Sequence, residues 1–278
     1  MAGTTFALAA IIFYLSAFAL QVTAITRAGP PAPKKAKAVR DALTLTVAGA
    51  ALLLHFNISF NQLAGDRGFD FSLLPVSVAL LAVINLIVIV GCLRQSLHNL
   101  FLLLFPASAI ALVISALYYH EPATTRILAP GLGTHILLSL VAYSLLTVAA
   151  LVALFLAYQN RQLHQHHNNG LMRILPPLQT MESLLFAILG TGFVLLTLAL
   201  ITGFVFVEDL LAQHLVHKTV FSLLAWLLYA ILLWGRFKLG WRGRIATYWT
   251  LGGFFALMLA FWGSKFVLEV LLSQPATG

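Results

Sequence analysis

Charged residues are scarce in this sequence. Only 9% of the 278 residues are charged, whereas 61% are hydrophobic. A soluble domain has about 25% charged and about 45–50% apolar residues. There are too few charged side chains to cover a surface that faces water. The composition therefore excludes a soluble globular protein and predicts a polytopic membrane protein.

Cysteine and the common sequence motifs of enzymes are also nearly absent. The single cysteine, Cys92, excludes an intrachain disulfide and any metal site built from cysteines alone. The sequence has no Walker, zincin or Rossmann pattern and no internal repeat of the kind found in transporters. No series of carboxylates runs through the apolar segments, as a proton or cation pathway would need. A secondary transporter is therefore the least favoured class.

Eight long apolar runs are present, and each is long enough to cross about 30 Å of hydrocarbon as a helix. The first run has no basic n-region and no A-x-A-type cleavage site, so we interpret it as a retained helix and not as a signal peptide. The sequence thus predicts an all-α integral membrane protein, a bundle of eight transmembrane helices that forms one transmembrane domain over residues 1–278. The runs cover residues 4–26, 42–64, 72–93, 98–119, 132–158, 183–207, 215–236 and 246–272.

Basic residues concentrate in alternate loops between these runs. Twelve of the 16 Lys and Arg residues lie between runs 1 and 2, 3 and 4, 5 and 6, or 7 and 8, whereas six of the eight acidic residues lie on the opposite side. The positive-inside rule makes the first set of loops cytoplasmic and places both termini outside, in the periplasm. The net charge of +8 therefore records membrane insertion and does not indicate a nucleic-acid partner.

A few polar residues interrupt the apolar runs or border them. Asn85 lies mid-run and predicts a hydrogen bond between helices. Glu182 comes just before run 6, where the helix dipole favours an acid. Lys265 and Glu269 are four residues apart, which fits a local ion pair. The tract His164 to His167 is interpreted as a hydrated polar loop, with metal binding as the alternative.

Histidines gather toward the predicted outer face. Five of the nine lie there: His55, His120, His135, His214 and His217. Residues His135, Ser139, Tyr143 and Thr147 repeat every four positions and form one polar stripe on an apolar helix. Neutral imidazole is a common metal ligand and a standard axial ligand of haem iron. The pattern leaves two interpretations open, haem ligation and hydrogen-bonded histidines at the membrane interface.

Several short motifs resemble the cytochrome c assembly (CcsA/CcmC/HemX) family. The resemblance extends over roughly residues 40–270 and is strongest over 131–265, and the eight-helix HemX-like branch is the most similar. The motifs are His135-Ile-Leu-Leu-Ser-Leu-Val-Ala-Tyr143, Leu178-Gln-Thr-Met-Glu182, Gly192-Phe-Val-Leu-Leu-Thr-Leu198, Ile201-Thr-Gly203, His217-Lys-Thr219 and Trp226-Leu-Leu-Tyr-Ala230.

The resemblance implies a protein of the bacterial inner membrane that handles haem b at the outer face. It implies that His135 is the first axial ligand of the haem iron, and it places Lys218, Trp226 and Tyr143 in family motifs. Because His217 and His214 both begin run 7 on the outside, His217 is the best candidate for a second ligand and His214 the reserve. The expected partners are the lipid bilayer, haem and other cytochrome-assembly or membrane proteins.

The sequence also departs from the family pattern. The loop from Phe206 to Gln213 has no tryptophan, where the family's haem-presenting loop is rich in it. Trp234 stands where CcsA-type members have a membrane histidine, and residues 266–278 contain no histidine. We therefore expect no catalytic residues and no haem–cytochrome c synthetase activity. The alternative is a non-catalytic subunit that stabilises or regulates another membrane protein, in which the histidines are structural.

Overall fold

The computed structural model describes residues 2–26, 33–65, 68–95, 97–120, 131–165, 175–206 and 213–263. Within these residues eight helices are long and apolar enough to cross a membrane. This confirms the prediction of an all-α protein with eight candidate transmembrane helices. The orientation of the termini stays a prediction.

The helices follow the apolar runs closely, with four short elements between or after them. The long helices are α1 (Ala2–Thr26), α2 (Lys34–Leu63), α3 (Leu73–Cys92), α4 (Phe101–Tyr118), α5 (Leu132–His164), α6 (Leu178–Phe206), α7 (Gln213–Leu239) and α8 (Gly243–Met258). The short elements are β1 (Ala64–Gly65), β2 (Gly68–Phe69), η1 (His98–Leu100) and the π-helical turn η3 (Leu259–Gly263).

Several helix boundaries differ from the prediction by five residues or more, and one of them is the start of α6, which is Leu178 and not residue 183. Helix α2 begins at Lys34, whereas the predicted run begins at residue 42, so the basic residues from Lys34 to Arg40 are helical. Pro33 precedes it with a φ of −51°, and its carbonyl accepts a hydrogen bond from the amide of Lys37. Helix α5 likewise continues to His164. Hydropathy marks only the part of a helix that lies in hydrocarbon, whereas backbone hydrogen bonds can extend the helix into water.

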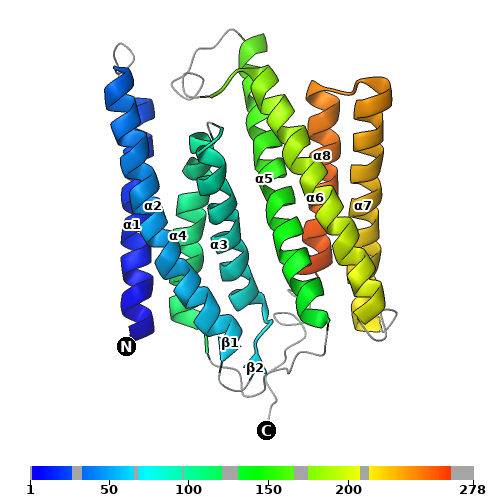
Figure 1. Ribbon diagram of the computed structural model, residues 1–278, viewed down its shortest axis with the longest axis horizontal. Coiled ribbons are helices and arrows are strands. Elements are labelled where there is room, and N and C mark those ends of the chain that lie inside the picture. The colour runs from blue at the N-terminus through cyan, green and yellow to red at the C-terminus, as the bar shows by residue number, and fades with distance from the viewer. Residues whose placement is uncertain are drawn as a thin grey trace. The chain divides into compact units, whose positions relative to one another are not determined.

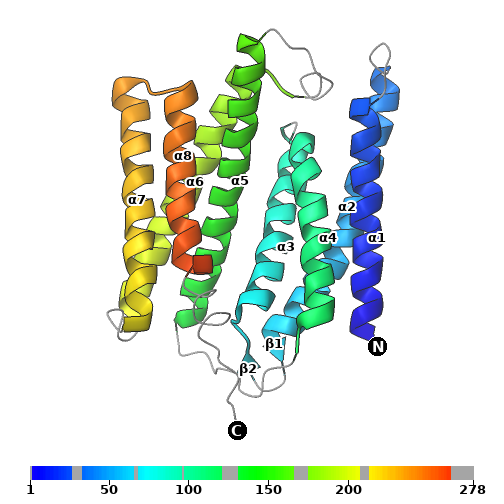
Figure 2. The same cartoon turned by 180° about the vertical axis from the view of Figure 1, so that it is seen from behind.

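The helices form two compact groups, shown in Figures 1 and 2. Unit 1 comprises residues 1–126 and 166–176, and unit 2 comprises 127–165 and 177–278. In unit 1, α1 packs on α2 and α4, and α3 packs on the same two helices. In unit 2, α5 packs on α6 and α8, and α7 packs on the same two helices. The single transmembrane domain over 1–278 stays a prediction.

Buried polar pairs join the helices of unit 1. Asn85 of α3 donates through Nδ2 to Ser108 Oγ of α4 at 2.7 Å, which confirms its predicted role between helices. The hydroxyl of Tyr14 on α1 is 3.0 Å from Nδ1 of His55 on α2, and both side chains are fully buried. A buried polar group without a partner is costly in lipid, so these pairs restrict how the helices of unit 1 can rotate.

Small residues let α5 and α6 approach closely in unit 2. The buried residues of α6 recur every three or four positions and include Gly192, Ala199 and Gly203. A Cβ atom at Gly192 would lie 2.9 Å from Cδ2 of Leu146 on α5. Helix association in a membrane depends on such close packing, because lipid tails are as apolar as the helix surfaces. The same narrow interface positions His135.

Candidate functional site

His135 lies in the first turn of α5. The residue before the helix, Gly131, has a φ of +84°, a left-handed conformation that favours glycine. Its carbonyl oxygen accepts hydrogen bonds from the amides of Thr134 and His135. The turn at Gly131 therefore starts the helix and sets the position of His135 at its beginning.

The imidazole of His135 is oriented by the backbone of α6. Nδ1 of His135 donates to the carbonyl oxygen of Ala199 at 2.8 Å. A carbonyl oxygen can only accept, so in the neutral ring Nδ1 carries the proton and Nε2 carries the lone pair. Nε2 has no hydrogen-bond partner among the residues that the structure describes. This is the arrangement in which metal-bound histidines are commonly held, with one nitrogen donating to a carbonyl and the other free to bind.

Gly203 makes room for this imidazole. A Cβ atom at position 203 would lie 2.9 Å from Cε1 and 3.2 Å from Nδ1 of His135. Such contacts are too short, so any side chain here would push the ring away. We call His135, Ala199 and Gly203 together the imidazole seat. Ala199 and Gly203 were not predicted as site residues from the sequence, although Gly203 lies in one of the family-like motifs.

Tyr143 faces a different helix from His135. Its ring lies 6.1 Å from the rings of Phe254 in α8 and Phe261 in η3, measured between centroids. Thr147 donates its hydroxyl to the carbonyl of Tyr143, within α5 itself. The polar stripe predicted from the sequence is therefore divided, because its first residue contacts α6 and Tyr143 contacts α8 and η3.

Trp226 joins α7 to α6. Its indole Nε1 donates to Thr197 Oγ1 at 2.9 Å, and its ring stacks on Phe193 at 5.7 Å. In the structure its N–H is therefore engaged in helix packing. Lys218, also on α7, is half-buried.

The two candidates for a second ligand both lie near the start of α7. His217 is exposed. His214 lies in the first turn of the helix, and its side chain is outside the described residues. Among the described residues, the hydrogen-bond contacts of the His135 ring are to Ala199 and Thr202, and none is to His217. Pairing of His135 with either histidine stays a prediction.

The remaining histidines of the predicted outer group are in unit 1. His55 is bonded to Tyr14, as the structural interpretation expected. His120 is exposed, and its Nδ1 lies 2.9 Å from the carbonyl oxygen of Tyr118. Within the described part of the chain, no group of three or more His, Cys, Asp and Glu side chains could hold a bare metal ion. Haem iron needs only one or two axial side chains, since the porphyrin supplies the others.

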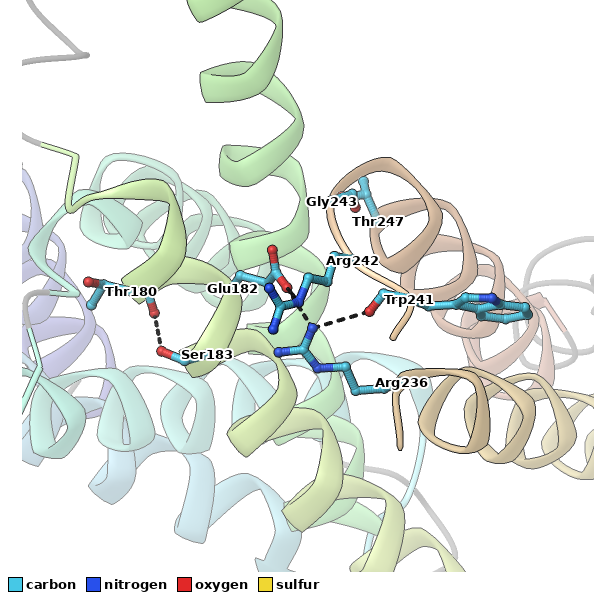
Figure 3. Close-up of polar contacts among 8 residues, drawn as sticks. All are labelled: Thr180, Glu182, Ser183, Arg236, Trp241, Arg242, Gly243 and Thr247. Carbon is cyan, nitrogen blue, oxygen red and sulfur yellow. Dashed lines mark hydrogen bonds and ion pairs between the residues drawn. The ribbon is translucent and has the colours of Figure 1, made fainter. Parts of the chain in front are cut away.

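A second cluster lies at the start of α6 and the end of α7, and it was not predicted from the sequence (Figure 3). Glu182, only 8% exposed, accepts a hydrogen bond on Oε1 from Nη1 of Arg236 at 2.8 Å. Nε of Arg242 lies 3.5 Å from the same oxygen. We call these three residues the Glu182 cluster. The sequence interpretation gave Glu182 only a helix-dipole role, because its partners lie more than 50 residues away and no local pattern marks them.

Several predicted features lie outside the described residues. These are the side chain of His164 and residues His166 and His167, the loop over 207–212, and the pair Lys265 and Glu269.

The described residues define a class of protein. It is a membrane protein with eight long apolar helices, in which one helix begins with a histidine whose Nε2 is available to bind a ligand. Comparison with known proteins identifies the family. Residues 4–272 match the family model described as "Cytochrome C assembly protein". The chain belongs to the cytochrome c assembly family, as the sequence motifs predicted.

Named relatives agree with this assignment. The chain is 34% identical to inner membrane protein YpjD of Escherichia coli K12 over 207 residues, which are 74% of this chain and 78% of the relative. It is 32% identical to an uncharacterized 28.8 kDa protein of Azospirillum brasilense over 200 residues, or 70% of this chain and 74% of the relative. Cytochrome c biogenesis protein CcsA of Picosynechococcus is 30% identical over 86 residues, covering 30% of this chain and 25% of the relative. No solved structure matches the chain.

These findings establish the location and the general role. The protein is a multi-pass protein of the bacterial inner membrane, in contact with lipid. Membership of the family supports a role in cytochrome c biogenesis and implies work with haem, the group that cytochromes c carry.

Proposed function

We propose that the protein binds haem b at the outer face of the inner membrane through His135, and that it assists cytochrome maturation or regulates haem supply. The observation that carries the proposal is the hydrogen bond of His135 Nδ1 to Ala199, which leaves the lone pair on Nε2. With this tautomer, His135 would hold a haem iron through Nε2.

The residues around His135 support binding more than catalysis. The Ala199 carbonyl holds the ring in one orientation, as backbone carbonyls commonly do for histidines that bind metals. Because Gly203 has no side chain, the ring can lie directly against α6. When bound, haem supplies an iron that accepts the imidazole lone pair. Because the loop over 206–213 has no tryptophan of the kind that presents haem in synthetase members, we propose a haem-handling protein and not an enzyme.

The outward direction of the imidazole seat rests on the distribution of charge. Arg236, Lys238, Arg242 and Arg244 lie at the end of unit 2 that also contains the start of α6, whereas His135 lies where α5 begins and α6 ends. The positive-inside rule makes the arginine-rich end cytoplasmic. In a Cys92→Ser background, we expect Ser183→Cys to resist a membrane-impermeant maleimide in spheroplasts and to react after lysis. Labelling of Ser183→Cys in closed spheroplasts would reverse the orientation.

The haem proposal is tested by absorption spectroscopy of the full-length protein. Purified gently from cells with ample haem, it is expected to show a Soret band. His135→Ala should remove most of this band, because the axial nitrogen is lost. His120→Ala is the matched control, because His120 is an exposed histidine of unit 1, and this variant should keep the band.

The second ligand is tested in the same way, by comparing His217→Ala with His214→Ala. The variant that loses the ligand should change the spin-state bands of the bound haem. A wild-type protein that retains no haem would overturn the proposal and favour the alternative, a non-catalytic subunit with structural histidines. Equal bands in wild type and His135→Ala would overturn the role of His135.

A further inference from the structure

The turn between α7 and α8 is attached firmly to α6. Arg236, near the end of α7, donates through Nη1 to Glu182 at 2.8 Å and to the carbonyl oxygen of Trp241 at 3.3 Å. Its guanidinium also lies 4.4 Å from the centroid of the Phe186 ring. Arg236 therefore uses its charge within the protein, and of the two arginines beside Glu182 it makes the shorter ion pair.

The backbone of this turn has little freedom to change. A Cβ atom at Gly235 would overlap the ring of Trp241, so only glycine lets the indole lie against α7. The amide of Trp241 donates to the carbonyl of Gly235 at 3.2 Å, and the Trp241 ring lies 5.5 Å from that of Trp249. These contacts hold the next residue, Arg242, in a defined place.

The guanidinium of Arg242 is only partly engaged by the protein. Its side chain is 68% exposed, and only its Nε approaches Glu182, at 3.5 Å. The two Nη groups have no partner among the residues described in the structure. Lys238 and Arg244 are also exposed on this turn. With Glu182 already neutralised, the turn presents an excess of positive charge that attracts anions.

The exposed apolar side chains around the turn indicate which anion it attracts. Large apolar side chains are exposed directly beside the cations, which is stable only if they face lipid. A cation at the edge of a lipid-facing surface lies at the level of the phospholipid headgroups. The exposed apolar and aromatic residues are Trp234 (58%), Phe237 (83%), Leu239 (58%), Ile245 (45%) and Tyr248 (72%).

We propose that this turn is a binding site for the phosphate of an anionic phospholipid, and that Arg242 is its principal contact. A guanidinium with both Nη groups available can form two parallel hydrogen bonds to a phosphate diester. Arg242 is also the N-cap of α8, whose first amides have no side-chain cap, so the helix dipole adds to the attraction. The site is separate from the imidazole seat and does not depend on haem.

The proposal is tested by lipid retention. The full-length protein is purified from mixed micelles of phosphatidylglycerol and phosphatidylcholine, and bound lipid is counted by native mass spectrometry. We expect preferential retention of phosphatidylglycerol, because it lacks the choline cation that the turn would repel. Arg242→Gln should weaken binding by about tenfold, the loss expected for hydrogen bonds to a charged group. Arg161→Gln on α5 is the control, since Arg161 is exposed at the same end of unit 2.

Two further measurements separate the alternatives. Arg242→Lys keeps the charge but loses the two-pronged geometry, and we expect it to bind between wild type and Arg242→Gln. Phosphatidylglycerol should persist in millimolar inorganic phosphate, and displacement by the free ion would mean that the site takes phosphate and not lipid. Equal retention of the two lipids, or equal effects of Arg242→Gln and Arg161→Gln, would also overturn the proposal.

Discussion

Replacement of Gly203 by alanine is expected to displace the imidazole of His135 and to destabilise unit 2 by about 2 kcal/mol, a typical cost of overpacking a tight interface. The new Cβ atom would lie 2.9 Å from Cε1 of His135, and the ring cannot move away without losing its hydrogen bond to Ala199. The effect should appear as easier unfolding in detergent and, where haem is bound, as a weaker Soret band.

Gly190→Ala is the matched control on the same helix. A Cβ atom at Gly190 has nothing within 4 Å, so the substitution should be neutral or slightly stabilising, by up to about 1 kcal/mol of helix propensity. If Gly203→Ala behaved like Gly190→Ala in both stability and haem content, the imidazole seat would not have the tight packing described above.

Replacement of Glu182 by alanine is expected to have the second large effect, about 3 kcal/mol of lost stability, because it leaves a largely buried arginine without its counter-ion. The side chains of Glu182 and Arg236 are only 10% and 22% exposed. Arg236 would lose its 2.8 Å hydrogen bond and would keep the weaker contacts with the carbonyl of Trp241 and the ring of Phe186. Unfolding in detergent, followed by circular dichroism, measures this loss.

The double variant Glu182→Met with Arg236→Met completes the test. Removing both charges leaves no unpaired ion, so the double variant should recover much of the stability lost in Glu182→Ala. Asp41→Ala is the comparison for a more exposed ion pair, with Arg40 at 3.1 Å, and should cost less than about 1 kcal/mol. A cost for Glu182→Ala as small as that for Asp41→Ala would mean that the Glu182 cluster does not hold α7 to α6.

The helices could be predicted because their cause is local. In lipid each backbone amide must bond within its own segment, so a long apolar run becomes a helix whatever its neighbours are. The ends were less predictable. Lys34 and His164 lie in helices that extend past the hydrocarbon, where hydropathy carries no signal.

The candidate site was predicted only in part. His135 stood out because it begins an apolar helix and lies in a family-like motif. Its hydrogen bond to Ala199 could not be predicted, since a backbone acceptor leaves no mark in the residue types. The same is true of Trp226, whose N–H reaches Thr197 on the neighbouring helix.

By itself, the sequence determined the membrane class, the eight helices and the family, because hydrophobicity and short motifs are properties of neighbouring residues. Only the tertiary structure decided which nitrogen of His135 is free, and it paired Glu182 with Arg236 instead of leaving it to the helix dipole. The reason is that each helix can rotate about its own axis at little cost to its backbone bonds. Close packing at residues such as Gly203 selects one rotation, and that selection brings distant side chains together.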